Sequence, residues 1–440
     1  MVNETQKRKE EHAVSLFHAG QLPQSEAVFS ELLQSYQSFW LWRSHAVVSL
    51  HLRNLDRALE SINRAIALEP LNADGYLLKI EILKAAGRKD ALIQCCNELL
   101  LVDPSQTSAA LIKGQTYEAA GNIVLSDLEY KNYLERLFGN DKGINALNHL
   151  DLAYHMGHLR TKASPFMDYP RHVMFETFAQ CNAACSFCVY PDMARQGEQM
   201  PMTLIDKIIG DLQQIPREVG FQLSPLAVNE PFLDKRIFGI LDKIALKLPN
   251  AQLTLTSNAS PLTPEVFRKL SNYKLDYLWL SIVDYRKEVY EEKMKLSWDR
   301  LLKRLEMIHK AKEEGQFPYR TVVSRLMDHS EHDQKYQAFF KSRFPLFEVA
   351  LWPYTNWLGK TGNAVTSAIP NLPCSHWFEF RVDAKGIVQH CCMDGHSEYP
   401  WGDVNKQSVL EIYNSPDYKK LRRDVFSRRE VSPCNTCNLR

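Results

Sequence analysis

The sequence lacks any long hydrophobic run and any excess of charge of one sign. No apolar stretch in the 440 residues approaches the roughly 18 residues that a transmembrane helix requires. The formal net charge is +1, so the chain has no strong overall field to attract nucleic acid or an acidic membrane. The opening stretch MVNETQKRKEEHAV is charged and has no apolar core of the kind found in signal peptides. We therefore expect a cytoplasmic protein with neither nucleic acid nor membrane as a partner.

Cysteine is scarce in the first part of the chain and clustered in the rest. Of the ten cysteines, only Cys95 and Cys96 precede residue 180. In a reducing compartment, clustered cysteines indicate a metal site or catalysis rather than disulfides. Cys95 and Cys96 fall in a helical, apolar stretch, and we interpret them as buried packing residues.

The first 140 residues also lack strand-like alternation, and their pattern is that of a helical repeat. Turn residues recur every 33 or 34 positions, at Gly20, Asn54, Gly87 and Gly121. A small residue follows each turn, at Ser25, Ala58, Ala91 and Ser126. This period resembles that of tetratricopeptide repeats, in which small residues let paired helices approach. The resemblance implies a domain over 1–150 that presents a concave surface to a peptide or partner protein, or that serves as a scaffold or self-association element.

From about residue 170 to 355, short β-rich runs alternate with helical stretches. The runs are HVMFETF, FQLSPLAV, AQLTLTS, DYLWLSIV, YRTVVSRL and FEVALWPY. Alternation of strands and helices favours a parallel sheet. We therefore expect an α/β domain over 165–370 that forms a partial (β/α)6 TIM-type barrel. In that architecture the chemistry lies at the C-terminal ends of the strands.

Three cysteines follow the first of these runs, in the stretch ETFAQCNAACSFCVYP. Cys181, Cys185 and Cys188 have the spacing C-x3-C-x2-C. Structural zinc sites use four ligands, so the alternatives are a zinc loop with a distant fourth ligand and an iron–sulfur cluster with one open iron. The spacing resembles that of radical S-adenosylmethionine (radical SAM) enzymes. Phe187 adds to the resemblance, because the family has an aromatic residue before the last cysteine.

The radical SAM resemblance implies a [4Fe–4S] cluster on these thiolates, with SAM as the ligand of the open iron. It also implies reductive cleavage of SAM to a 5′-deoxyadenosyl radical, and a reductant such as a flavodoxin or ferredoxin. Further along, the chain resembles the family's SAM-binding motifs in the same order. The residues implied to contact SAM are Glu230 and Asn229, Ser257 and Asn258 in TLTSNAS, Ser281 in WLSIVDY, and Lys293 or Lys295. Asn229 stands where the family has a glycine, and the lysines stand where relatives often have an arginine.

The tail, 371–440, is short and holds a second set of cysteines. Its sequence resembles the auxiliary-cluster domains of radical SAM enzymes, called SPASM or twitch, in the run from Gly386 to Cys391 and in the phrase WGDVNKQSVLEIYNS. The resemblance implies one auxiliary [4Fe–4S] cluster; a zinc ribbon is the alternative for the Cys-x2-Cys pair at its end. The implied ligands are Cys374, Cys391, Cys434 and Cys437. Cys392 is left over, either as packing or as a thiol that donates hydrogen to a substrate radical.

The remaining polar candidates lie near predicted strand ends. They could line a substrate pocket and act there as catalytic groups: Asp284, Tyr285 and Arg325, with Trp352 and Trp357 as pocket walls or as packing. We expect an oxidoreductase or epimerase that acts on a small polar metabolite such as a sugar or natural-product intermediate. The alternatives are a maturase whose ribosomal peptide or protein substrate docks on the repeats, and a non-enzymatic repeat scaffold stapled by zinc.

Overall fold

The protein is described here by a computed structural model, which covers residues 4–138, 149–361 and 369–439. Its contacts divide the chain into two compact units, Met1–Met156 and Gly157–Arg440. Residues 139–148 of the predicted repeat domain lie outside the described residues. Within the described part, no helix is both long enough and apolar enough to cross a membrane.

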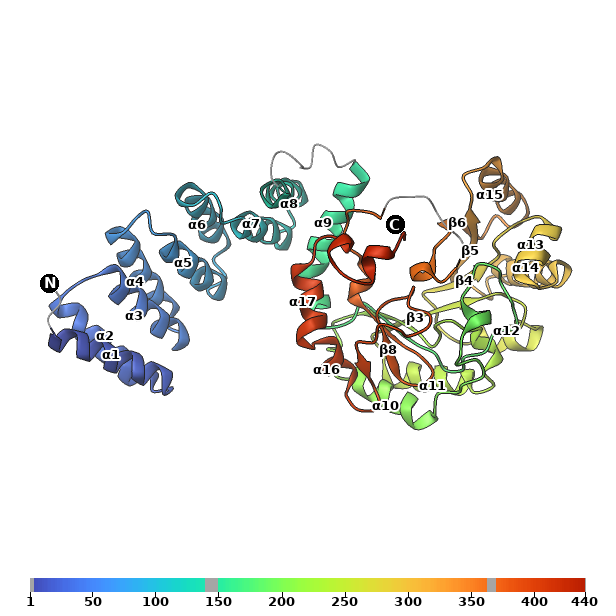
Figure 1. The fold of residues 1–440 in the computed structure, drawn as a ribbon, viewed down its shortest axis with the longest axis horizontal. Coiled ribbons are helices and arrows are strands. Elements are labelled where there is room, and N and C mark those ends of the chain that lie inside the picture. The colour runs from blue at the N-terminus through green and yellow to red at the C-terminus, as the bar shows by residue number, and fades with distance from the viewer. Residues whose placement is uncertain (1–3, 139–148, 362–368, 440) are drawn as a thin grey trace. The chain divides into compact units, whose positions relative to one another are not determined.

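The first unit is built from helices, consistent with the predicted helical repeats (Figure 1). Each helix packs against the next one along the chain. At several turns a glycine adopts a positive φ, for example 74° at Gly20 and 76° at Gly121, which an L side chain rarely adopts. The helices are α1 (Glu4–His18), α2 (Leu22–Ser35), α3 (Phe39–His51), α4 (Leu55–Leu68), α5 (Ala73–Ala85), α6 (Lys89–Val102), α7 (Ser108–Ala119) and α8 (Ile123–Phe138), and α9 (His149–Ala163) follows them.

Burial in these helices tests the repeat register. Three of the four predicted small residues, Ser25, Ala58 and Ser126, are fully buried, and so are Cys95 and Cys96. The prediction for Ala91 is wrong, because Ala91 is exposed and its neighbour Leu92 is buried instead. The left-handed turn residue of the second repeat is Arg53, at φ 60°, rather than Asn54. Asn54 instead caps α4, since its side chain accepts a hydrogen bond from the amide of Arg57.

The second unit contains a nine-stranded sheet whose first six strands confirm the predicted barrel. These six strands are parallel and lie side by side in chain order, so each crossover returns the chain to the same edge. The ladder continues past β1 into a seventh parallel strand and two short antiparallel strands. The strands are β1 (His172–Phe175), β2 (Phe221–Ser224), β3 (Ala251–Ser257), β4 (Tyr277–Ser281), β5 (Arg320–Met327), β6 (Glu348–Pro353), β7 (Glu379–Val382), β8 (Ile387–Gln389) and β9 (Gly402–Asp403).

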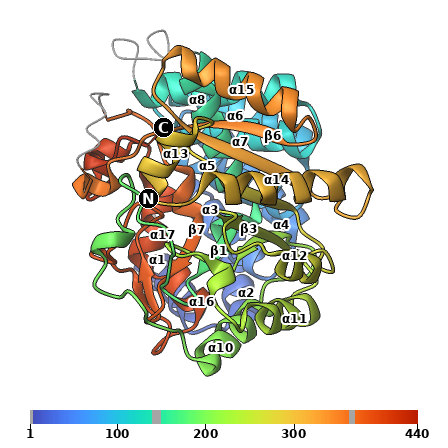
Figure 2. The same cartoon turned by 90° about the vertical axis from the view of Figure 1, so that its right-hand side faces the viewer.

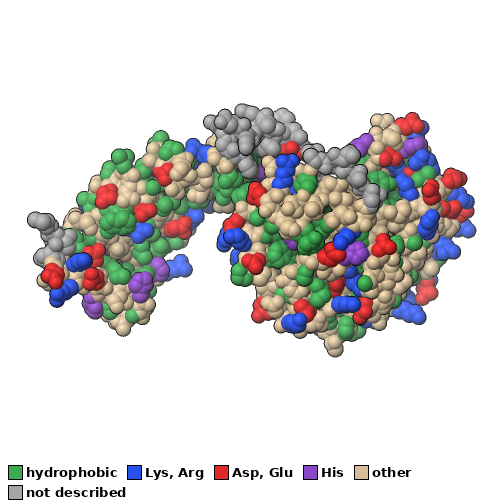
Figure 3. All heavy atoms as spheres, in the orientation of Figure 1, with side chains coloured by type: hydrophobic (Ala, Val, Ile, Leu, Met, Phe, Trp, Pro, Cys, Tyr) green, Lys and Arg blue, Asp and Glu red, His purple; other side chains and the backbone are tan. Residues whose placement is uncertain are grey.

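Helices cover the sheet and bury its apolar side chains in one core (Figure 2). The stripe of Ile205, Ile208, Ile209 and Leu212 on α10 is the clearest example, with the 3.6-residue spacing of an amphipathic helix. The helices of this unit are α10 (Met202–Leu212), α11 (Ile237–Lys247), α12 (Pro264–Leu270), α13 (Lys287–Met294), α14 (Trp298–Glu313), α15 (Glu331–Arg343), α16 (Val409–Tyr413) and α17 (Pro416–Asp424). Charged side chains of both signs are scattered over the face of this unit seen in Figure 3.

Candidate active site and auxiliary cysteine site

The three-cysteine loop begins at the C-terminal end of β1, where a buried ion pair anchors it. Glu176 is fully buried, and its carboxylate lies 2.6 Å from Nε of Arg195. The same carboxylate accepts hydrogen bonds from the amides of Val228, in the loop after β2, and Ala384, in the turn after β7. A buried ion pair is stable only when its remaining hydrogen-bonding capacity is satisfied. This pair therefore ties the start of the cysteine loop to two other loops of the site.

The cysteine loop itself is held by the end of α13. The amide of Ala184 donates to the carbonyl of Met294 at 3.3 Å, and that of Ser186 donates to the carbonyl of Lys293 at 3.1 Å. These carbonyls lie in the last turn of the helix, where backbone acceptors have no partner within the helix. The C-terminal end of α13 thus fixes the loop on both sides of its second cysteine, Cys185.

The three thiols lie half-buried in apolar surroundings. Backbone amides approach two of the sulfurs, with Ala183 N 3.5 Å from Cys181 Sγ and Tyr190 N 3.4 Å from Cys188 Sγ. Burial raises the pKa of the Cys181 thiol to about 11, so without metal the thiol form dominates at neutral pH. Since thiolates are the ligating form, binding of a metal centre would release protons here.

Glu230, Ser257 and Asn258, predicted separately as SAM contacts, form one hydrogen-bonded group. The Glu230 carboxylate accepts from the Ser257 hydroxyl at 2.9 Å and from the Asn258 amide at 2.8 Å. Burial raises the pKa of Glu230 to about 7, against the opposing effect of these bonds. The side-chain amide of Asn258 lies 2.9 Å from Oδ1 of Asn182 and 3.9 Å from Sγ of Cys181. The group therefore lies directly beside the cysteine loop.

Asn229, where the family motif has a glycine, is held by its own loop. Its Oδ1 accepts from the amide of Ala227 at 2.8 Å. Its buried Nδ2 has no hydrogen-bond partner in the described part of the chain. A buried donor without a partner is costly, so this nitrogen is a candidate to bind a ligand of the site.

The other predicted SAM contacts, Ser281 and the two lysines, differ in how close they lie to the cysteine loop. Ser281 ends β4 and is half-buried. Lys293 donates from Nζ to the hydroxyl of Tyr354 at 2.7 Å, next to the cysteine loop. Lys295 ends α13 in a left-handed conformation and is exposed. Of the two lysines, Lys293 is the one that faces the site.

Asp284 and Arg325, predicted as catalytic groups, form a buried ion-pair network. Arg325 is fully buried and lies 2.6 Å from Asp284, 2.8 Å from Asp333 and 2.9 Å from Asp328. Burial alone would raise the pKa of Asp284, but hydrogen bonds from Arg286 and Arg325 hold it at about 2. Such a carboxylate is a weak base at neutral pH. This geometry favours a structural role over contact with substrate.

Tyr285 lies at the rim of this network. Its hydroxyl is 2.9 Å from Nδ1 of His332, and its ring packs on that of Phe339. Its role as a catalytic group stays a prediction.

Replacing Asp284 by asparagine tests the structural role. We expect Asp284→Asn to lower the free energy of unfolding by about 1–3 kcal/mol, because Arg325 would lose the charge of its fully buried partner but keep its ion pairs with Asp328 and Asp333. Denaturant unfolding measures the change. The exposed pair Arg320–Glu348 provides a control, since Arg320→Ala should cost less than about 1 kcal/mol. A variant that stayed fully stable but was inactive would instead place Asp284 among the reacting groups.

The second cysteine set surrounds one small cavity. Cys374, Cys391, Cys434 and Cys437 line it together with Arg428 and Leu358. Two further groups approach a single sulfur: His390 Nε2 lies 3.2 Å and Trp377 Nε1 3.4 Å from Cys434 Sγ. Hydrogen bonds to a ligating sulfur are one means by which a protein tunes an iron–sulfur cluster. The predicted four ligands are thus brought together.

The four thiols line one cavity, and four thiolates fit either an iron–sulfur cluster or a structural zinc ion. Cys392 does not line that cavity and packs beside Met393 and Cys437.

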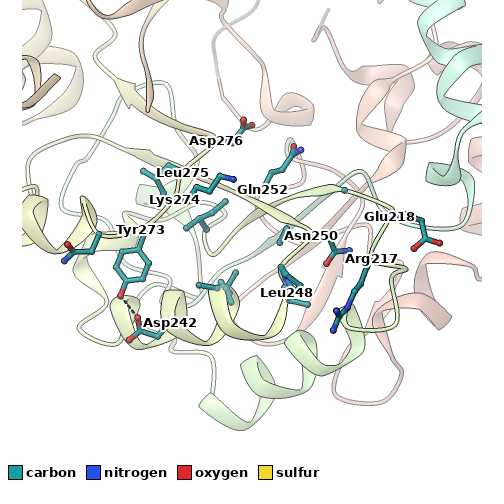
Figure 4. A pocket seen from close by; sticks show the side chains of 17 residues that line it. Arg217, Glu218, Asp242, Leu248, Asn250, Gln252, Tyr273, Lys274, Leu275 and Asp276 are labelled. Carbon is teal, nitrogen blue, oxygen red and sulfur yellow. Dashed lines mark hydrogen bonds between the residues drawn. The ribbon is translucent and has the colours of Figure 1, made fainter. Parts of the chain in front are cut away.

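A wide cavity of about 860 Å³ lies at the opposite edge of the sheet (Figure 4). It is lined by residues before or at the start of β2, β3 and β4, such as Gly220, Gln252 and Asp276. Asp242 and Tyr273 meet there through a 2.6 Å hydrogen bond. Because the strands are parallel, this edge is the one away from the cysteine loop, and the cavity does not belong to the same chemistry.

Comparison with known families agrees with both cysteine sites. Residues 175–341 match the radical SAM superfamily, and residues 374–438 match SPASM, an iron–sulfur cluster-binding domain. The chain therefore carries a radical SAM domain followed by a SPASM domain. The first implies a [4Fe–4S] cluster and SAM, and the second implies auxiliary cluster binding. Both sets of thiol donors described above fit these groups.

Solved structures that resemble the chain share little sequence with it. SuiB of Streptococcus suis bound to precursor peptide SuiA has a TM-score of 0.46 and 14% identity, over 76% of this chain and 86% of that one. BtrN in complex with AdoMet and 2-DOIA has a TM-score of 0.44 and 14% identity, over 61% of this chain and 92% of that one. The comparison with curated proteins found no match.

Proposed function

We propose that the protein cleaves SAM reductively at Cys181, Cys185 and Cys188 and uses the resulting radical to oxidise a small polar metabolite. The observation that carries the proposal is the pairing of two cysteine sites in one unit: an open three-cysteine loop and a four-cysteine cavity. When bound, the cluster and SAM supply a 5′-deoxyadenosyl radical that takes a hydrogen atom from the substrate. To complete the oxidation, the substrate radical must lose one electron and one proton. A site ligated by four cysteines suits acceptance of the electron, and a base or solvent must take the proton.

The chain's own residues prepare this site in three ways. The Glu176–Arg195 pair and the end of α13 fix the cysteine loop. The Glu230 group organises the adjacent end of β3, and Asn229 offers an unpaired donor beside it. A reductant of the flavodoxin or ferredoxin class is required, because SAM cleavage consumes an electron. An epimerase would instead return a hydrogen to the substrate, for which Cys392 is the candidate donor.

A second candidate substrate is a ribosomal peptide or a protein side chain. The helical unit supports it, since stacked helix pairs commonly form extended binding surfaces. In that case the repeats would dock the substrate or its partner.

The release of 5′-deoxyadenosine separates these candidates. Anaerobically reconstituted protein with SAM and reductant would be mixed with a metabolite fraction or a peptide fraction of host extract. We expect the metabolite fraction to stimulate release several-fold over buffer. Stimulation by the peptide fraction alone would replace the small-molecule proposal with the peptide one. A protein that held zinc instead of iron and released no 5′-deoxyadenosine would contradict both.

A further inference from the structure

A short segment after β6, Tyr354–Leu358, contacts both cysteine sites; we call it the inter-site segment. On the auxiliary side it is tied to the residues that flank Cys437. The amide of Asn356 donates to Oδ1 of Asn438 at 3.1 Å, and its Nδ2 donates to the carbonyl of Thr436 at 2.9 Å. The inter-site segment is thus fastened to the loop that carries the last auxiliary cysteine.

On the other side, the inter-site segment is tied to the radical SAM loop. Trp357 donates from Nε1 to the carbonyl of Phe187, the residue before Cys188, at 3.0 Å. Trp357 also packs with Val189 in a cluster that includes Cys188. The ring of Tyr354 stands edge-on to that of Phe187, with centroids 6.5 Å apart. One side of the inter-site segment therefore lies against the three-cysteine loop.

The backbone of the inter-site segment is held in an unusual conformation. Trp357 and Leu358 have φ values of 48° and 55°, and Gly359 follows at 85°. L side chains rarely adopt this left-handed region, and such residues persist only where their surroundings over-determine them. The consequence is that adjacent side chains serve different sites: Trp357 packs at the three-cysteine loop, while Leu358 lines the four-cysteine cavity.

We propose that the inter-site segment is a rigid spacer that sets the distance and orientation between the two clusters. Two positioning residues hold it: Trp357 of the segment at the three-cysteine loop, and Asn438, next to Cys437, at the four-cysteine site. The proposal rests on the proposed function in requiring a cluster at both sites. Its consequence is that one electron can leave one cluster and enter the other at a rate fixed by the spacer, with no bond made or broken and no proton transferred.

The magnetic interaction between the two reduced clusters tests the spacer. Electron paramagnetic resonance of the dithionite-reduced full-length protein reports it, and the signal that changes on addition of SAM identifies the three-cysteine site. We expect Trp357→Phe and Asn438→Ala each to keep the iron of both sites but to alter or weaken the interaction. Trp279→Phe is the matched control. It removes the 2.9 Å hydrogen bond from the indole N–H of Trp279 in β4 to the hydroxyl of Ser324 in β5, and it should leave the magnetic interaction unchanged.

The iron content of each variant is a second test of the spacer. If either single variant loses iron from both sites, its side chain is needed to build the sites rather than to set the distance between them, and the spacer is refuted. If each variant loses iron only from the site it touches, or keeps all iron with an unchanged interaction, the spacer is refuted. Leu358→Gly gives a third test, because glycine adopts the left-handed conformation freely and should broaden the distribution of inter-cluster distances.

Failure of the spacer and failure of the proposed function give different results. A protein with a normal inter-cluster interaction but no 5′-deoxyadenosine release in any extract would contradict the proposed function alone. An unchanged interaction in the spacer variants, with normal release, would contradict the spacer alone. A protein with iron at only one site would overturn the spacer whatever its activity.

Discussion

Replacing Cys181, Cys185 and Cys188 together by alanine should abolish 5′-deoxyadenosine release and remove about half of the iron. The three thiols are the only cysteines in the loop after β1, and each is a predicted ligand of the proposed cluster. Without them the buried group of Glu230, Ser257 and Asn258 would remain, but nothing would bind the iron beside it. Anaerobic reconstitution followed by iron and sulfide analysis, with chromatography of the reaction mixture, measures both effects.

The control for this variant is a pair of cysteines that belong to neither of the two cysteine sites. Cys95 and Cys96 are buried in the helical unit, and burial raises the pKa of Cys95 to about 12 and that of Cys96 to about 11. They are therefore inert thiols, and alanine at both positions should leave the iron content and SAM cleavage unchanged. Full activity of the triple variant would contradict the radical mechanism as a whole.

The strands and the cysteine sets could be predicted from the sequence because each depends on a local pattern. Six β-rich runs alternating with helices are enough to predict six parallel strands. The spacing of the cysteines can be read from the sequence without knowing the conformation of the loops. The repeat register was predicted less well. Ala91 is the small residue after the turn at Gly87, but the left-handed turn residues are Gly20, Arg53, Gly87 and Gly121. The residues five positions after them, Ser25, Ala58, Leu92 and Ser126, are the buried ones.

Residues that act through tertiary contacts gave no comparable signal. Glu176 begins the cysteine stretch, but no pattern marks it as an anchor, and its partner Arg195 lies 19 residues further along the chain. Only the packing of three loops brings their contacts together. Asp284 and Arg325 carried a signal that was ambiguous, because a charged residue at a strand end can serve chemistry or pair internally. Which of these applies depends on Asp328 and Asp333, whose position a linear pattern does not reveal.

Arg428 is the most consequential of the residues that the sequence did not point to. It is 1% exposed and lines the four-cysteine cavity. Its guanidinium donates only to backbone carbonyls, those of Leu372, Pro373 and Leu439. No ion pair joins it to a carboxylate within the described ranges, and its positive charge lies beside the cysteines that line the cavity. Burial raises the pKa of Cys374 to about 11, and the charges of His376 and Arg428 oppose that rise.

We expect Arg428→Gln to lower the midpoint potential of the auxiliary cluster. Reduction adds a negative charge to the cluster, and a nearby buried cation stabilises that charge. A unit charge about 8 Å from the cluster stabilises its reduced form by about 2 kcal/mol at an effective dielectric constant near 20. This corresponds to a shift of ~90 mV in the midpoint potential for one electron. A redox titration followed by electron paramagnetic resonance measures the shift. The expected consequence for turnover is slower oxidation of the substrate, with SAM cleavage in the absence of substrate unaffected.

Arg428→Lys separates the charge of this residue from its geometry. Lysine keeps the positive charge but cannot span three carbonyls as the planar guanidinium does. The potential of its auxiliary cluster should therefore stay near that of the unmodified protein even if less of the cluster is retained. Equal shifts in the Gln and Lys variants would mean that Arg428 acts by holding the flanks of Cys374 and Cys437 in place. A shift in the Gln variant alone would mean that the chain uses a buried positive charge to make its second cluster a better electron acceptor.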